Sequence, residues 1–205
     1  MNKPDNTLQY YIDNAEEYAR QTADADMSSV LDVFISRIPA NGSILDLGCG
    51  SGRDSKTFLE RGYSVTAIDG SPELCRIASK HTGLPVRCLM FQELDYIEAF
   101  SGIWACSSLH HLSRDQLNET LPRVIKALKP GGVLYTCFKY GESDCDDEKG
   151  RHFTCATEQS LNNLLEVVRD DIDMNEINVW ITGDNLGSRD LRWVNVVVAR
   201  KRLFI

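Results

Sequence analysis

Two carboxylates and three glycines in the first third of the chain have the spacing of a nucleotide-binding site. Asp46 precedes Gly48, Gly50 and Gly52, and Asp69 follows the glycines by about 20 residues. Glycines at alternate positions form a turn without side chains, so a ligand can approach the main chain closely. A carboxylate at the end of the second strand of a βαβ unit is placed to bind ribose hydroxyls. The pattern therefore predicts a site for a cofactor that contains a ribose.

The glycine spacing separates two families of such cofactors. A dinucleotide fingerprint has another glycine three positions after its second one. Arg53 occupies that position here, so an NAD-dependent oxidoreductase is disfavoured. The pattern is instead Asp-x-Gly-x-Gly-x-Gly, with Asp46 on the strand itself.

Short apolar runs alternate with amphipathic segments, and these elements must position the site. The apolar run 44–47 predicts a buried strand that ends at Gly48. The segment 55–61 predicts a helix with Gly62 as its C-cap. The remaining helices are predicted over residues 10–20, 28–38, 72–82 and 157–169, and the remaining strands over 63–68, 85–89, 102–106, 133–138, 172–181 and 193–199.

Two later segments carry their own local signals. Ser113 and Gln116 match a capping box at the start of a helix, which Pro122 is expected to interrupt. The polar, acidic segment 141–150 is expected to be a mobile loop or lid.

Four motifs in order resemble those of the class I S-adenosylmethionine (SAM)-dependent methyltransferases, from about residue 10 to residue 200. Among these enzymes, the small-molecule branch that includes the tellurite-resistance-type methyltransferases is the most similar. A glycine turn without a ligand would explain one of the motifs but not the ordered set. The motifs are Asp46-Leu-Gly-Cys-Gly-Ser-Gly52, Asp69-Gly-Ser-Pro72, Cys106-Ser-Ser-Leu-His-His111 and Leu128-Lys-Pro-Gly-Gly-Val-Leu134.

The predicted fold is an α/β three-layer sandwich of the Rossmann-like kind. Its seven-stranded sheet is expected to be mostly parallel. The resemblance implies one antiparallel strand near the C-terminal edge, which we assign to Trp193–Ala199. We expect a single methyltransferase domain over residues 1–205, with a helical cap over 1–40 and a core over 41–205.

The resemblance implies that the cofactor is SAM and the product S-adenosylhomocysteine. Its methionyl end is expected at the glycine turn and its ribose at the carboxylate after the second strand. The expected cofactor-binding residues are Tyr11, Tyr18, Asp46, Gly48, Cys49, Gly50, Gly52, Asp54, Asp69, Gly70, Ser71, Gln92, Glu93, Cys106 and Ser107.

Three of these assignments leave alternatives open. Asp54 either reaches the cofactor's ammonium group or is a carboxylate in the first turn of a helix, where the dipole favours it. The adenine contact after the third strand falls to Gln92 or Glu93. Tyr11 and Tyr18 lie on one helix face and either close over the methionyl group or pack on the sheet.

Four residues are candidates for the acceptor side. Either His110 or His111 could serve as a general base near neutral pH, or both could be hydrogen-bonded loop histidines. Lys139 and Arg151 could hold an anionic acceptor, or could be surface charges that pair with the acidic loop. No metal site is expected, because no third ligand stands near the histidines. The default mechanism is in-line methyl transfer by proximity.

Composition limits the partners. The net charge of −8 over 205 residues disfavours nucleic acid, and the sequence shows no apolar run long enough for a membrane span. The seven cysteines have no Cys-x-x-Cys pair, as in reduced cytoplasmic proteins. We therefore expect a cytoplasmic monomer or homodimer that methylates a small molecule. The alternatives are a non-catalytic SAM-binding regulatory protein and a methyltransferase that acts on nucleic acid or protein.

Overall fold

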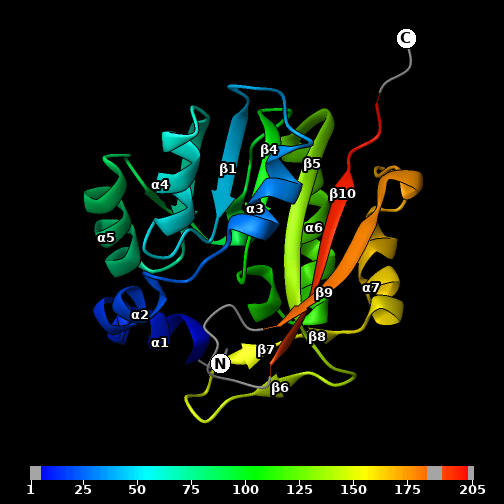
Figure 1. Cartoon of the computed structure of the whole chain (residues 1–205). Coiled ribbons are helices and arrows are strands. Elements are labelled where there is room, and N and C mark those ends of the chain that lie inside the picture. Colours follow the sequence, from blue (N-terminus) through cyan, green and yellow to red (C-terminus); the bar gives the residue numbers. More distant parts are fainter. Residues whose placement is uncertain (1–5, 184–190, 203–205) are drawn as a thin grey trace.

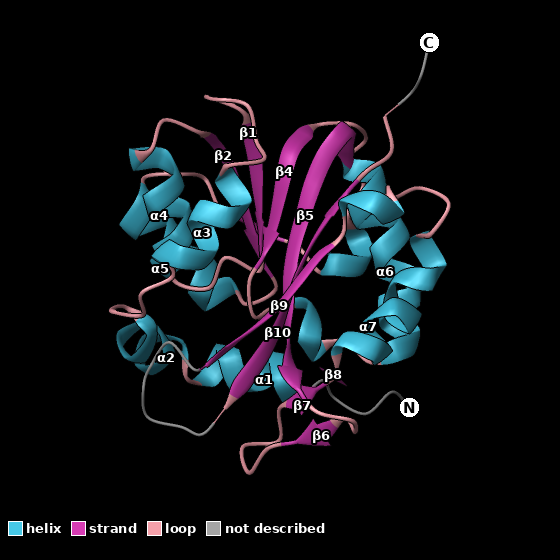
Figure 2. Cartoon of the chain, turned by 45° about the vertical axis from the view of Figure 1, so that its right-hand side comes forward, coloured by secondary structure: helices cyan, strands magenta, loops and turns pink. Residues whose placement is uncertain are grey.

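A central β-sheet runs through the structure, with helices on both faces (Figures 1 and 2). The computed structural model describes residues 6–183 and 191–202. The strands are β1 (Ser43–Leu47), β2 (Ser64–Asp69), β3 (Arg87–Cys88), β4 (Phe100–Ala105), β5 (Leu128–Tyr140), β8 (Cys155–Ala156), β9 (Asn178–Gly183) and β10 (Arg192–Ala199), with β6 (Cys145–Asp146) and β7 (His152–Phe153) in a separate small sheet. The helices are α1 (Asn6–Asp13), α2 (Ala15–Thr22), α3 (Ser28–Ile35), α4 (Arg53–Glu60), α5 (Pro72–Thr82), α6 (Arg114–Ala127) and α7 (Glu158–Leu165).

The strand order is β3-β2-β1-β4-β5-β10-β9, and the short β8 pairs with β5. β1 is parallel to both β2 and β4, so the order reverses between β1 and β4. β10 is antiparallel to its neighbours β5 and β9, which confirms the antiparallel strand predicted near the C-terminal edge. In an open α/β sheet, a ligand binds at the carboxyl ends of the strands beside such a reversal.

Alternate residues of the central strands face opposite layers, as expected for pleated strands. On one face Ile44 and Trp104 pack with Phe34 of α3 and Phe58 of α4. On the other face Ile103 and its neighbours pack against α6 and α7. These two apolar cores hold the carboxyl ends of β1 and β4 in fixed positions.

The N-terminal helices α1 and α2 lie across the carboxyl ends of the strands, next to the β6–β7 hairpin (Figure 1). The single helix predicted over 10–20 is wrong in this detail, because a turn at Asn14 separates two helices. The Asn14 side-chain amide donates to the carbonyl of Tyr10 at 2.9 Å, and such local bonds compete with helix continuation.

Two other predictions need correction. α6 continues through Pro122, because Leu121 and Val124 on either side of it are buried in one core and outweigh the helix-breaking cost of about 3 kcal/mol. The strand predicted over 172–181 begins only at Asn178, because the side chain of Asp173 accepts the amide of Asn175 and forms a turn.

Among the described residues, the helices are too short or too polar to cross a membrane.

Candidate functional site

The turn after β1 has the left-handed backbone that favours glycine. The φ angles of Gly48, Gly50 and Gly52 are 81°, 55° and 82°. A Cβ on Gly50 would lie 3.3 Å from Cε1 of Tyr18, so the glycine keeps the space below the cap open. Gly52 instead begins α4 and allows α5 to pack closely, because its Cβ would lie 3.1 Å from that of Ala78.

Asp69 at the end of β2 fixes this turn from the side. Its Oδ2 accepts the amide of Gly50 and its Oδ1 accepts the amide of Ser71, both at 2.9 Å. Burial raises the pKa of Asp69 to about 6. Each carboxylate oxygen has a second lone pair, so Asp69 can still accept hydrogen bonds from a ligand.

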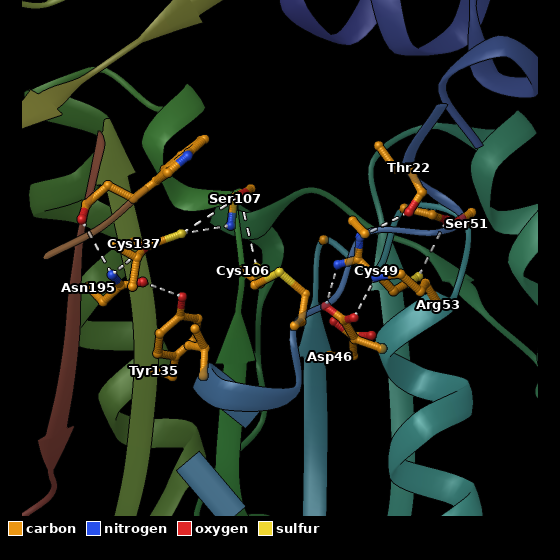
Figure 3. A pocket seen from close by; sticks show the side chains of 18 of the residues that line it. Thr22, Asp46, Cys49, Ser51, Arg53, Cys106, Ser107, Tyr135, Cys137 and Asn195 are labelled. Atoms are coloured by element: carbon orange, nitrogen blue, oxygen red, sulfur yellow. Dashed lines mark hydrogen bonds and ion pairs between the residues drawn. The ribbon is translucent and has the colours of Figure 1, made fainter. Parts of the chain in front are cut away.

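Two cavities meet at the glycine turn. They share Tyr18, Gly48, Gly50 and Ser107, and their volumes are about 130 and 90 Å³. We call them the Arg53 cavity (Figure 3) and the Asp69 cavity, after the charged residue that marks each. The Asp69 cavity is also lined by Thr7, Leu8, Tyr11, Gly70, Leu74, Leu89, Met90, Phe91, Ser108, His111 and Leu112.

An ion pair forms one wall of the Arg53 cavity. The guanidinium of Arg53 donates to both oxygens of Asp54, at 2.7 and 3.0 Å, and to the carbonyl of Thr22 on α2 at 3.1 Å. The indole of Trp104 also donates to Asp54, at 2.9 Å. Asp54 is therefore occupied by protein donors, which favours its interpretation as an anchored carboxylate in the first turn of α4. The cationic side of this wall, Arg53, was not among the predicted ligands.

Asp46 lies beneath the same cavity and is 3% exposed. The hydroxyl of Ser55 donates to its Oδ2 at 2.6 Å. Burial, together with the nearby charge of Asp54, raises the pKa of Asp46 to about 7. A buried carboxylate with a single side-chain donor can accept further bonds from a cationic ligand.

The opposite wall of the Arg53 cavity comes from β4, β5 and β10. The predicted residues Cys106 and Ser107 lie there, together with Tyr135, Cys137 and Asn195, which were not predicted. Tyr135 donates to Oδ1 of Asn195 at 2.8 Å. The only sequence signal for Asn195 is that it interrupts the apolar run of β10.

The cap closes over the glycine turn with two tyrosines. The rings of Tyr11 and Tyr18 meet edge to face, with centroids 5.0 Å apart, and Tyr18 reaches both cavities. Ser71, expected to bind the cofactor, caps α5 and donates from its hydroxyl to the carbonyl of Tyr11 at 3.3 Å. Ser71 therefore attaches α1 to the core and does not line either cavity.

The two histidines after β4 have different surroundings. His111 lines the Asp69 cavity, and its Nε2 lies 2.8 Å from the hydroxyl of Tyr11. Its Nδ1 lies 2.7 Å from the carbonyl of His152, which can only accept, so Nδ1 carries the proton. Burial lowers the pKa of His111 to about 4. His110 is buried, lines neither cavity, and its pKa is also lowered by burial.

The predicted acceptor-binding cations lie outside both cavities. Arg151 makes two bonds to Oδ2 of Asp147, at 2.9 and 2.6 Å, and one to the hydroxyl of Tyr11 at 3.4 Å. Lys139 places its Nζ 3.0 Å from the ring centroid of Phe153. Both cations therefore brace the β6–β7 hairpin, and a direct role toward an acceptor stays a prediction.

The segment after β3 presents different side chains from those predicted. Glu93 accepts the amide of Met90 at 2.9 Å, and neither Gln92 nor Glu93 lines a cavity. Met90 and Phe91 line the Asp69 cavity instead. No group of three or more metal-binding side chains occurs among the described residues.

Comparison with known proteins indicates a methyltransferase, as the sequence motifs predicted. A family model described as a methyltransferase domain matches residues 44–132. The putative methyltransferase YqeM of Bacillus subtilis is 34% identical over 116 residues, which is 51% of this chain and 47% of that protein. The ubiquinone biosynthesis O-methyltransferase of Xylella fastidiosa is 33% identical over 113 residues, 51% of this chain and 45% of that protein. The match thus spans about half the length of these two relatives.

Solved structures share the fold over nearly the whole chain. The 1,6-didemethyltoxoflavin-N1-methyltransferase of Burkholderia thailandensis was solved with bound 1,6-didemethyltoxoflavin and S-adenosylhomocysteine. Its TM-score to this chain is 0.76 at 23% identity, and the alignment covers 97% of this chain and 88% of that protein. The [4+2]-cyclase SpnF has a TM-score of 0.66 at 18% identity, and the alignment covers 96% of this chain and 95% of SpnF. Family model, relatives and fold together support a class I SAM-dependent methyltransferase: residues 44–132 match a methyltransferase domain, and the fold is shared with solved SAM-dependent methyltransferases.

Proposed function

We propose that this chain binds SAM across the two cavities and transfers its methyl group to a small-molecule acceptor. The observation that carries the proposal is the meeting of the cavities at Gly48 and Gly50, with Asp69 on one side and Arg53 on the other. SAM has a matching shape and charge, because a ribose with two hydroxyls lies toward one end and a carboxylate at the other.

The residues present fit each part of the cofactor. Asp69 keeps lone pairs for the ribose diol, and the apolar side chains of Met90 and Phe91 suit the adenine ring. At the other end Arg53 suits the methionyl carboxylate and Asp46 suits the ammonium group. The sulfonium falls where the cavities meet, beside the ring of Tyr18, and aromatic rings attract such cations.

SAM supplies an activated methyl group when it is bound, so the chain's own contribution is to position the reactants and exclude water. The tyrosine cap serves the second purpose, because Tyr11 and Tyr18 cover the glycine turn. His111 is a weak base at neutral pH with its lowered pKa, which supports transfer by proximity. A toxoflavin-type N-methyltransferase and ubiquinone O-methyltransferases among the similar proteins are compatible with a small-molecule acceptor.

A role other than methyl transfer, such as that of a non-catalytic SAM-binding protein, is the second candidate, because a fold does not fix an activity and one protein that shares this fold is a cyclase. The first test is calorimetric titration with SAM, S-adenosylhomocysteine and NAD. We expect the first two to bind and NAD not to bind. Asp69→Asn should weaken SAM binding by about tenfold, because it removes charge-assisted hydrogen bonds to the ribose. Asp95→Asn, on an exposed loop, is the control and should leave the affinity for SAM unchanged.

A second measurement separates catalysis from binding. Release of S-adenosylhomocysteine from SAM would be followed with a panel of phenolic, amine and thiol acceptors. Turnover that depends on one acceptor class supports the enzyme. Tight SAM binding without turnover on any class would favour the non-catalytic alternative, and absence of SAM binding would overturn the proposal.

A further inference from the structure

Cys106 directly follows β4, Cys137 lies on the neighbouring parallel strand β5, and both line the wall of the Arg53 cavity (Figure 3). The register pairs Trp104 with Tyr135 and Ala105 with Thr136, so Cys106 is the next residue along and lies opposite Cys137. Neighbouring strands are about 4.8 Å apart, and disulfides join Cα atoms roughly 4.4–6.8 Å apart. Continued by one residue, this register gives the two Cα atoms a spacing that a disulfide can bridge.

The loop after β4 directs hydrogen bonds at the sulfur of Cys137. The amide of Ser107 donates to Sγ at 3.3 Å, and its hydroxyl lies 3.7 Å away. Ser107 reaches this position with a φ of 51°, a left-handed conformation that is uncommon outside glycine. The neighbouring Cys106 thiol, together with the hydrogen bond from the Ser107 amide, lowers the pKa of Cys137 below the usual value of a thiol.

The surroundings of Cys137 distinguish it from the other buried cysteines. Burial raises the pKa of Cys49 and Cys75, and it also raises the pKa of Cys155. The thiolate is the reactive form of cysteine, and redox-sensor cysteines are accessible and often have a second thiol beside them that resolves the oxidised intermediate. Cys137 is accessible through the Arg53 cavity, which it lines. Cys106 is the second thiol beside Cys137.

We propose that Cys137 and Cys106 form a peroxide-sensitive modification site whose oxidation and the binding of cofactor exclude each other. The Cys137 thiolate attacks one oxygen of hydrogen peroxide, the O–O bond breaks, and the hydroxide that leaves takes up a proton to form water. The sulfur of Cys106, losing its proton, then attacks the sulfenic acid at Cys137, and a second water leaves as the S–S bond forms. Two thiols are oxidised and one peroxide is reduced to two waters.

The link to the cofactor runs through Ser107 and rests on the proposed function. Ser107 lines both cavities, and its amide is held by the Cys137 sulfur. A disulfide alters this sulfur and the loop conformation that depends on it, so we expect the Kd for SAM to rise at least about tenfold. By reciprocity, bound SAM must disfavour the oxidation to the same degree at equilibrium, and it also slows the reaction, because it fills the cavity from which peroxide reaches Cys137.

The test uses the full chain treated with hydrogen peroxide, with and without SAM, followed by alkylation and peptide mapping. We expect one disulfide, between Cys106 and Cys137, whose formation SAM slows. Cys145→Ser is the matched control, because Cys145 is exposed and adjoins Cys155. It should leave the Cys106–Cys137 disulfide unchanged. A disulfide that joins Cys145 to Cys155 instead, or a rate that SAM does not change, would overturn the proposal.

The Cys106→Ser variant identifies the attacking thiol. Without its partner, Cys137 should accumulate as a sulfenic acid that dimedone labels, and labelling at other cysteines in its place would contradict the assignment. Calorimetry on the reduced protein keeps the two proposals apart. If the reduced chain does not bind SAM, the proposed function fails, while peptide mapping still decides whether the thiol pair is oxidised.

Discussion

The hydroxyl of Tyr11 on α1 lies 2.8 Å from Nε2 of His111, and this bond joins the N-terminal cap to the loop after β4. Because Nδ1 of His111 is bonded to the carbonyl of His152 at 2.7 Å, Nε2 is the acceptor and Tyr11 donates. The cap, the β6–β7 hairpin and the core therefore meet at one imidazole. A cofactor in the Asp69 cavity lies beneath this junction, since both residues line that cavity.

Removing the Tyr11 hydroxyl should loosen the cap. We expect Tyr11→Phe to lose a hydrogen bond worth about 1 kcal/mol and to raise the Kd for SAM roughly fivefold. The change should appear mainly in a faster dissociation rate, measurable by stopped-flow displacement. Tyr10→Phe is the matched control, because its hydroxyl contacts only the surface residue Lys149 in the described structure. Equal dissociation rates for the two variants would show that the Tyr11 bond does not hold the cap closed.

The glycine turn offers a pair of substitutions with similar backbone cost. Gly50 and Gly83 have φ angles of 55° and 78°, so alanine at either should cost about 1–2 kcal/mol of stability. A Cβ at Gly50 would press against Tyr18 in the shared part of the cavities, whereas nothing lies within 4 Å at Gly83. Gly50→Ala should therefore also weaken SAM binding by about tenfold or more, because the added methyl group displaces Tyr18 and fills space that the cofactor needs. If calorimetry gives both variants the wild-type Kd, the cofactor does not approach this turn.

The sequence predicted the elements and the backbone contacts of the site better than its side-chain contacts. Gly48, Gly50 and Asp69 were predictable because a tight turn and a strand end each require a particular residue type at a fixed spacing. The side chains that line the Asp69 cavity after β3 were not predictable, because Glu93 instead accepts the amide of Met90. Local side-chain to backbone bonds of this kind leave no periodic signal in a sequence.

The far wall of the Arg53 cavity shows a second limit. Tyr135 and Asn195 come from β5 and β10, which are distant in sequence and meet only through the antiparallel pairing of these strands. Each alone is typical of an ordinary strand residue, and only the register brings the hydroxyl to the amide oxygen. Lys139 and Arg151 show the opposite error, because the sequence placed them near an acceptor site. In the structure Lys139 contacts the ring of Phe153 and Arg151 donates to Asp147, both in the β6–β7 hairpin.

Arg53 should recognise the methionyl carboxylate. Arg53→Met is expected to cost about 1–2 kcal/mol of stability, because Asp54 loses a partly exposed ion pair. It should also raise the Kd for SAM by about tenfold or more through the loss of a charged hydrogen bond. 5′-Methylthioadenosine lacks the carboxylate, so its Kd should be the same for wild type and variant. Arg61→Met is the control. Arg61 caps the C-terminal end of α4, the helix that Arg53 begins, and the variant removes only a surface ion pair with Asp32 of α3, so neither Kd should change. A parallel loss of 5′-methylthioadenosine binding in Arg53→Met would assign the effect to distortion of the site.

Asp46 should make SAM binding depend on pH. Its pKa is raised from 3.8 to about 7 by burial, so below pH 7 the free protein holds this carboxyl neutral. A cationic ligand favours the ionised form, so the Kd for SAM should rise about tenfold for each pH unit below 7 and level off above it.

The stability of the fold should depend on pH with the opposite sign. A carboxyl group with a raised pKa contributes stability below its unfolded pKa of 3.8, and this stability is lost as the pH rises through 7. Asp46→Asn should therefore be more stable than wild type at about pH 8, by roughly 2–4 kcal/mol, and should bind SAM weakly with a pH profile that is flat above the pKa of Asp69, about 6. Glu60→Gln on the exposed end of α4 should keep both wild-type profiles. Calorimetry and urea unfolding between about pH 6.5 and 8, above the pKa of Asp69, measure the two quantities, and a sloping SAM profile in Asp46→Asn over this range would place the titrating group elsewhere.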